Sequence, residues 1–186
     1  MANPEHVEVL DTFDRLSVCM YRTGISLFPI ALLSYVLLLA NELSGFNLIT
    51  ISTQTPLILL ASATALSSAN LHVYDKKIRA IISLSGWIGL LLSILLNDSH
   101  YLWIAQGFMF FTFSGIALKE SFCFKVAGLK ITPALLCLSV FMIAFKQSMI
   151  IIVLLFIVSL IFVFLAQAKW RMPLHFDIGN KANYQI

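Results

Sequence analysis

The chain has 186 residues, of which 60% are hydrophobic and only 11% are charged, with a formal net charge of +3 and a mean hydropathy of +0.93. Charged residues make up about a quarter of a soluble domain, so this composition excludes a soluble protein and indicates that lipid surrounds most of the chain. A mass of 20.8 kDa leaves room for one helical bundle and no separate catalytic domain. The small positive charge is a topology signal and not a sign of nucleic-acid binding.

Residues 1–22 form a polar, acidic arm in which apolar residues recur at intervals of three and four, with Glu8, Asp11 and Asp14 between them. The apolar positions are Val7, Leu10, Phe13, Leu16 and Met20. This periodicity predicts a short amphipathic helix, which lies either along the membrane surface or against the basic loops of the bundle. The arm lacks the order of a secretory signal, so no cleavage is expected.

Six apolar segments follow, which predict an all-α fold with a six-helix transmembrane bundle over residues 23–168. The segments cover about 23–40, 56–73, 78–96, 101–118, 131–145 and 148–168, and a tail follows at 169–186. The fifth segment would be about 22 Å long as a helix, against a hydrocarbon core of about 30 Å. Lys130 and Lys146 at its ends could reach outward to the interfaces. A re-entrant or strongly buried fifth segment is the alternative.

The positive charges indicate an orientation for this bundle. Of the twelve Lys and Arg residues, all except Lys146 fall in alternate gaps between the apolar segments or in the two terminal regions. Cytoplasmic loops carry such an excess, so both termini are expected in the cytoplasm of a bacterial inner membrane. The three cysteines form no CxxC pair, and their odd number argues against a disulfide framework.

Two segments allow a prediction about packing. In the second, Ala61, Ala65 and Ala69 form a stripe of small residues at four-residue spacing, and such stripes let helices approach closely. We therefore expect this stripe at the centre of the bundle. The sixth segment, from Ile150 to Leu165, consists almost wholly of large apolar residues, so we expect it to face lipid along much of its surface.

Polar residues gather at the predicted cytoplasmic ends of the segments, where they could converge on one ligand- or partner-binding site. The candidate residues are Arg22, His72, Tyr74, Glu120, Cys123 and Asp177. Glu120 could form an ion pair with Lys119 or with Arg22, or could relay protons. The tail is either an ordered hook, with a turn at Gly179 and Asp177 capping backbone amides, or disordered.

Catalytic chemistry has little support in the pattern of residues. His72, Glu120 and Cys123 have side chains that could ligate zinc or iron, but they share no recognised ligand spacing, so no catalytic or metal-ligating residue is assigned and any cofactor is unknown. Motifs for nucleotide binding, zinc proteolysis and serine hydrolysis are absent from the sequence. The segments carry no charged residue near the predicted midplane, which disfavours an ion-coupled transporter.

Four stretches of the sequence resemble a family of uncharacterised bacterial integral membrane proteins, a domain of unknown function found in cyanobacteria and proteobacteria. They are Tyr21-Arg22-Thr23-Gly24, His72-Val73-Tyr74, Lys119-Glu120-Ser121-Phe122-Cys123-Phe124 and Asp177-Ile178-Gly179-Asn180-Lys181. In the family pattern Ala commonly replaces Ser121 and Asp replaces Asn180. The resemblance covers nearly the whole chain and implies no activity, substrate or cofactor.

The sequence therefore favours a non-enzymatic inner-membrane protein that binds a protein partner or a small ligand at its cytoplasmic face. One alternative is a small permease or channel for a neutral solute, because the segments contain small residues together with Ser and Thr. Another is a membrane enzyme that uses a metal or haem. The lipid bilayer is the one partner that all three interpretations share.

Overall fold

A computed structural model describes residues 9–45, 52–97 and 99–185. Helices form throughout this part of the chain, and it contains no β-strand. The six main helices are α1 (Thr12–Ser44), α2 (Thr55–Ala69), α3 (Lys76–Leu95), α4 (Leu102–Ser121), α5 (Thr132–Ala144) and α6 (Ser148–Trp170). The short helix α7 (His175–Ile178) and the 3₁₀ turn η1 (Lys181–Asn183) follow in the tail. The predicted all-α fold is confirmed.

The ends of α1 and α3 are defined by polar side chains. Asp11 caps α1 by accepting a hydrogen bond from the backbone N–H of Asp14, while the Asp14 carboxylate accepts one from the backbone of Asp11, which is a reciprocal capping box. Gly45 ends the helix in the left-handed conformation that glycine adopts without strain. Asp75 caps α3 through the backbone N–H of Ile78 at 2.9 Å.

The amino-terminal arm differs from the prediction of a separate short helix. The described part of the arm is the first portion of α1, which runs without a break through 33 residues. Val7, the first apolar position of the predicted pattern, lies outside the described residues. Phe13 and Leu16 are exposed at this end of α1, so the apolar side of the arm is not buried against the bundle.

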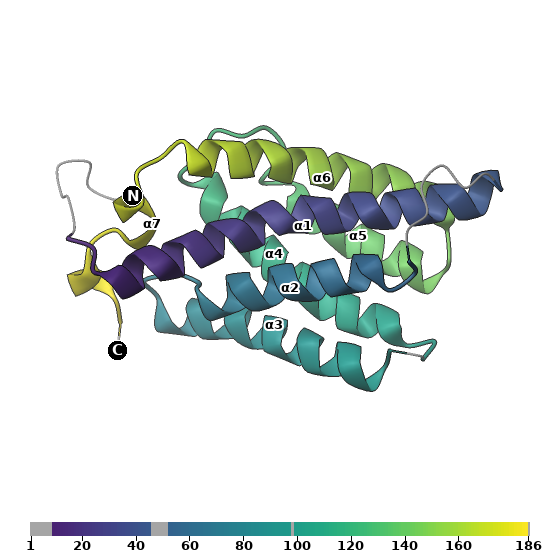
Figure 1. Ribbon diagram of the computed structural model, residues 1–186, viewed down its shortest axis with the longest axis horizontal. Helices are drawn as coiled ribbons and strands as arrows, with labels where there is room; N and C mark the ends of the chain where they lie inside the picture. Colours follow the sequence, from purple (N-terminus) through teal and green to yellow (C-terminus); the bar gives the residue numbers. More distant parts are fainter. Residues whose placement is uncertain (1–8, 46–51, 98, 186) are drawn as a thin grey trace.

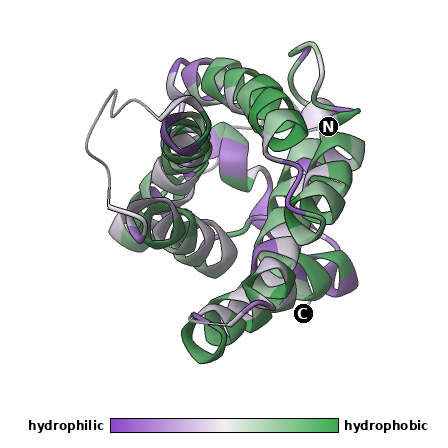
Figure 2. Ribbon diagram, turned by 90° about the vertical axis from the view of Figure 1, so that its right-hand side faces the viewer, coloured by the Kyte–Doolittle hydropathy of each residue, from purple (hydrophilic) through white to green (hydrophobic). Residues whose placement is uncertain are grey.

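The six helices form a ring in which each packs against the next along the chain and α6 closes against α1 (Figure 1). Viewed from the end opposite α7, the ribbons are green, and hence apolar, over most of their length (Figure 2). α1, α3, α4 and α6 are long and apolar enough to cross a membrane, whereas α2 and α5 are shorter apolar helices of 15 and 13 residues. Thr12 at the start of α1 and the tail helix α7 lie at the same end of the ring.

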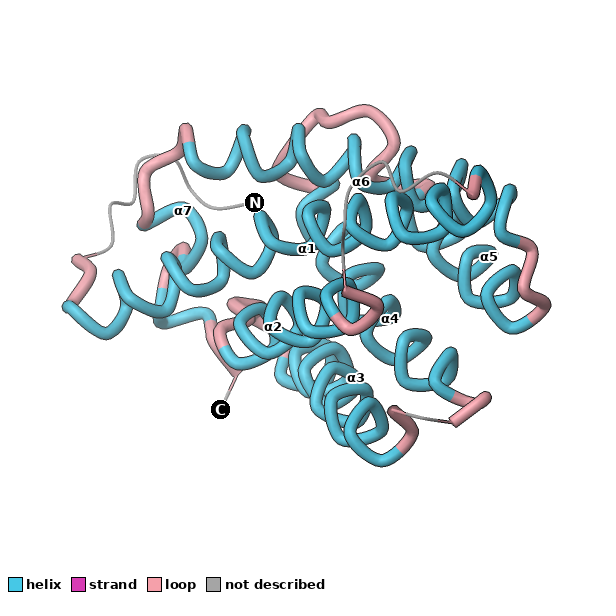
Figure 3. Tube along the Cα trace, turned by 45° about the vertical axis from the view of Figure 1, so that its right-hand side comes forward, coloured by secondary structure: helices cyan, strands magenta, loops and turns pink. Residues whose placement is uncertain are grey.

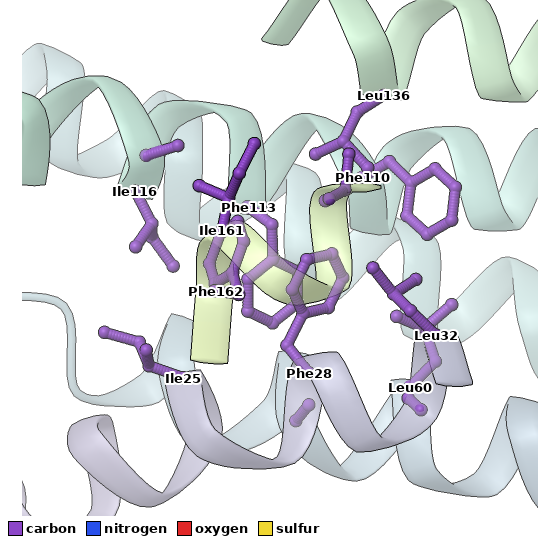
Figure 4. Packing of buried hydrophobic residues seen from close by; sticks show 14 of the residues in the cluster. Ile25, Phe28, Leu32, Leu60, Phe110, Phe113, Ile116, Leu136, Ile161 and Phe162 are labelled. Carbon is purple, nitrogen blue, oxygen red and sulfur yellow. The ribbon is translucent and has the colours of Figure 1, made fainter. Parts of the chain in front are cut away.

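The centre of the ring is filled by aromatic side chains from three helices. Phe28 of α1 stacks on Phe113 of α4 with ring centroids 3.6 Å apart, and Phe162 of α6 packs edge-on against Phe28 at 4.6 Å (Figure 4). All three side chains are completely buried. We call these three residues the aromatic layer.

The packing prediction for α2 is wrong. Ala61 and Ala65 are only partly buried and Ala69 is exposed, because α2 turns a neighbouring face toward the ring. That buried face carries Leu60, Ala63, Thr64, Ser67 and Ser68, which are also mostly small.

Half of the most apolar stretch of the sixth segment is buried, the largest share among the four long helices. Its other side, which includes Val153, Phe156 and Phe164, is exposed, so this is the part of the predicted lipid-facing surface that the bundle leaves open.

Candidate functional site

Glu120, at the last turn of α4, is the centre of a buried group of charged side chains. Its carboxylate accepts a hydrogen bond from the Tyr21 hydroxyl at 2.8 Å and another from the Lys169 ammonium at 2.9 Å. Lys119 forms a third contact, with its Nζ 3.1 Å from Glu120 Oε1. Glu120 is 1% exposed, so its charge is compensated by partners from α1, α4 and α6 and not by water.

Arg22 of α1 holds the start of the tail. Its Nε donates to Asp177 Oδ2 at 2.7 Å, and its two terminal nitrogens donate to the carbonyls of Met172 at 2.8 Å and Pro173 at 3.0 Å. The guanidinium also lies over the Trp170 ring, 5.9 Å from its centroid, in a cation–π arrangement. The planar fork of an arginine suits this set of oxygen acceptors better than a lysine would.

Lys169 joins the two carboxylates. Its ammonium forms ion pairs with Glu120 and with Asp177, and it lies 5.1 Å from the centroid of the Tyr21 ring. With Arg22 and Lys119, the group contains three cations and two carboxylates, a formal charge of +1. We call the six residues the charged cluster: Tyr21, Arg22, Lys119, Glu120, Lys169 and Asp177.

The tail continues from Asp177 as an ordered hook that docks on Tyr74. The Tyr74 hydroxyl accepts a hydrogen bond from the backbone N–H of Asn180 at 2.9 Å, and the Tyr74 carbonyl accepts one from the backbone N–H of Gln185 at 3.1 Å. Gly179 has φ +67° and lies directly against the Tyr74 hydroxyl. The Tyr184 hydroxyl donates to the Ile178 carbonyl at 3.0 Å. Of the two alternatives for the tail, the structure therefore supports the hook.

Burial changes the ionisation of the hook. Desolvation raises the pKa of the Tyr184 phenol above its ordinary value, the neighbouring Tyr74 raises it further, and Arg79 opposes the shift. The neutral phenol is therefore the form that the docked tail accommodates. Asp177, expected to cap backbone amides, instead forms its ion pairs with Arg22 and Lys169.

The six residues predicted from the sequence fall into four groups, the last of which is Cys123 alone. Arg22, Glu120 and Asp177 belong to the charged cluster, but Glu120 pairs with Lys119 and Lys169, not with Arg22. Tyr74 holds the hook. His72 lies beside the cluster, with Nε2 3.2 Å from the Ser17 hydroxyl and its ring edge-on to Tyr21.

Cys123 is the residue that lies apart from these interactions. Its side chain is exposed in the loop after α4 and carries a free thiol. In the part of the chain that the structure describes, no three His, Cys, Asp or Glu side chains are grouped closely enough to hold a metal ion.

The candidate residues predicted from the sequence lack three members of the cluster: Tyr21, Lys169 and Lys119, of which only Lys119 was considered, as a partner of Glu120. Tyr21 precedes Arg22 on α1, but a tyrosine at a span end is commonly an interfacial anchor. Lys169 was counted only as a topology signal. Lys169 continues the 3–4 spacing of Leu155, Val158, Phe162 and Leu165, which are all buried, but most other positions of α6 are apolar as well, so no signal in the sequence marked this line.

Comparisons with known proteins agree with this membrane fold. Residues 66–186 match the model of a family described as "Uncharacterized integral membrane protein (DUF2301)". An uncharacterised protein of Haemophilus influenzae is 34% identical over 186 residues, which cover all of both chains. No solved structure matches the chain. As an integral membrane protein, the chain contacts the lipid bilayer through its apolar helices. It therefore belongs to this family of uncharacterised integral membrane proteins.

Proposed function

We propose that this protein is a non-enzymatic inner-membrane protein that binds a protein partner or a small ligand at its cytoplasmic face. The observation that carries the proposal is the position of the Asp177 carboxylate. It comes from the tail, yet it lies between two buried cations, Arg22 and Lys169, which belong to the helices of the bundle. Arg22 and Lys169 therefore form an anion-binding site, and the Asp177 carboxylate of the protein's own tail occupies it.

The proposed topology has six spans with both termini in the cytoplasm. α2 and α5 are about 22 Å and 20 Å long, shorter than the hydrocarbon core of about 30 Å, but each packs between longer neighbours in the ring. Local thinning of the bilayer and outward extension of Lys130 and Lys146 would accommodate the short α5. The charged cluster then lies at the end of the bundle where the Lys and Arg excess indicates cytoplasm.

The chemistry of the cluster specifies what a ligand must carry. Two cations held on rigid helices bind a carboxylate or a phosphate group strongly, because charge-assisted hydrogen bonds in a low-dielectric site are stronger than neutral ones. A partner or ligand with such a group would compete with Asp177 for Arg22 and Lys169. Displacement of the hook from Tyr74 would then accompany binding and expose a new surface on the cytoplasmic side.

The proposal predicts opposite effects for the two sides of this ion pair. Asp177→Asn keeps the shape of the tail but weakens its hold on the cations, so we expect more co-purifying ligand or partner than in the wild type. Arg22→Gln removes one of the cations, so we expect that bound mass to be lost. Native mass spectrometry of gently solubilised protein measures both, with Glu42→Gln at the far end of α1 as the matched control.

Retention of every bound species in Arg22→Gln would rule out the site. An empty wild type together with an empty Asp177→Asn variant would also contradict the proposal. A permease for a neutral solute is less well supported, because the aromatic layer fills the centre of the ring through which a solute would have to pass.

A further inference from the structure

An apolar groove runs along the outside of the bundle between α3 and α5, and it is distinct from the charged cluster. Both helices pack against α4, and the three helices are drawn in Figure 3. Side chains of α4 form the floor of the groove. The groove consists of two adjoining sections with volumes of about 520 and 680 Å³, in the size range of ligand sites. Residues shared by both sections are Ile81, Trp103, Gly107, Phe111 and Val140.

The side chains that line the groove are almost all apolar. Its hydroxyl side chains, Ser85 and Ser114, each donate to a backbone carbonyl of α4 at 2.8 Å. The lining extends along α4 from Trp103 to Leu118, about 22 Å at 1.5 Å per residue. This covers more than one leaflet of a core about 30 Å thick, so an occupant must be long, narrow and apolar.

Two lysines, Lys77 and Lys130, stand at one end of the groove. Lys77 lies near the start of α3, on the same face as Ile81, Leu84 and Ile88, which line the groove. Lys130 lies three residues before Pro133, which is part of the lining contributed by α5. Both lysines are exposed. The nearby carboxylates are engaged elsewhere, because Asp75 caps α3 and Glu120 is paired inside the bundle.

We propose that this groove binds an anionic membrane phospholipid, with one acyl chain along α4 and its phosphate between Lys77 and Lys130. An apolar channel that ends at two exposed cations at the membrane interface matches the two chemical parts of such a lipid. A second copy of the chain fits less well, because an apolar transmembrane helix would bring no anion to the two lysines.

Tryptophan quenching by lipids with brominated acyl chains tests this proposal directly. In a background with Trp87, Trp103 and Trp170 changed to Phe, Phe111→Trp places one reporter in the groove. Phe156→Trp places a control reporter on the exposed side of α6, also in mid-helix and outside the groove. Each protein is reconstituted in phosphatidylcholine vesicles that contain a small fraction of brominated phosphatidylglycerol or of brominated phosphatidylcholine.

We expect brominated phosphatidylglycerol to quench the reporter at 111 at a mole fraction about fivefold lower than brominated phosphatidylcholine does. The two lipids should quench the reporter at 156 equally. Lys77→Gln with Lys130→Gln should abolish the preference at 111, whereas Lys146→Gln at the other end of α5 should leave it intact.

Three results would overturn the proposal. Equal quenching of the reporter at 111 by both lipids would show that the groove does not select an anionic lipid. A preference that survives in the double lysine variant would remove the phosphate site. A reporter at 111 that neither lipid quenches, beside a normally quenched reporter at 156, would show that a second copy of the protein covers the groove.

Discussion

The aromatic layer and the charged cluster lie two helical turns apart on the same three helices, and the tail adds Asp177 to the cluster. The residues that correspond, each seven positions apart, are Phe28 and Tyr21 on α1, Phe113 and Glu120 on α4, and Phe162 and Lys169 on α6. The aromatic layer depends on close, non-directional packing. The charged cluster depends on each charge having its partner, because an unpaired charge in a low-dielectric interior is costly. A substitution that preserves the shape of a side chain should therefore destabilise the charged cluster when it removes a charge, whereas the aromatic layer should tolerate it.

The largest effect is expected in the charged cluster. Glu120→Gln preserves the size of the side chain but leaves Lys169 without one of its two counter-charges, so we expect a loss of about 3–5 kcal/mol in the free energy of unfolding. Unfolding in mixed detergent micelles measures this loss. The double variant Glu120→Gln with Lys169→Met should cost less than the sum of the single variants, because the two residues interact directly.

A loss below about 1 kcal/mol for Glu120→Gln would contradict this account, because that is the range of ion pairs exposed to solvent.

The aromatic layer should tolerate a similar apolar side chain but not the loss of side-chain volume. Phe28→Leu stays apolar and nearly fills the site, so we expect a loss below about 1.5 kcal/mol, whereas Phe28→Ala leaves a cavity and should cost about 3 kcal/mol. The same unfolding experiment gives both values. If Phe28→Leu destabilised the protein more than Glu120→Gln, the distinction between the aromatic layer and the charged cluster would fail.

A smaller effect is expected in the hook, where Gly179 lies against Tyr74. Gly179→Ala would place a methyl group into the Tyr74 hydroxyl at a positive φ, so we expect the tail to detach, with a cost of about 1–3 kcal/mol. Gly45→Ala is the matched control, because Gly45 also has φ +67° but nothing lies within 4 Å of the added methyl group. Carboxypeptidase digestion should shorten the first variant faster than the second, and equal rates would speak against the docking of the hook.

The smallest expected effect is a dependence of the hook on alkaline pH. Because burial raises the pKa of Tyr184 in the docked tail, the phenol contributes fully to docking below its ordinary pKa of about 10. That contribution is lost as the pH rises through 10 toward the higher pKa of the docked form. The tyrosinate absorbance of the wild type and that of Tyr184→Phe should differ only at pH values above the ordinary tyrosine pKa of about 10. Ionisation of Tyr184 at an ordinary tyrosine pKa would show that the tail is undocked.

The prediction of helices succeeded because apolar length and charge distribution are local properties of the sequence. Which face of each helix is buried depends on its neighbours, and α6 illustrates the difficulty. It is apolar on every side, so the buried line that ends at Lys169 has no contrasting polar face to reveal it. For α2, two stripes of small residues compete, and only the positions of α1 and α3 decide between them.

The candidate site was predicted in part for a related reason. Polar residues at one end of several spans indicated where a cluster would form, which placed Arg22, Glu120 and Asp177 correctly at that end. Their pairing could not be predicted, because Arg22 and Asp177 are 155 positions apart and the tail could have been disordered. A lysine that follows a span also has an alternative role as a topology signal, which concealed the contribution of Lys169.

Hydrogen exchange of the tail tests most directly whether the charged cluster holds the hook in place. The backbone amides of Asn180 and Gln185 bond to Tyr74, far along the chain from Arg22. If the cluster is an anion site occupied by the tail, Arg22→Gln should increase exchange at both amides together by about tenfold and leave the amides of α4 protected. Unchanged exchange at Asn180 and Gln185 would contradict the account, because the tail would then be held independently of the cations that we propose a ligand competes for.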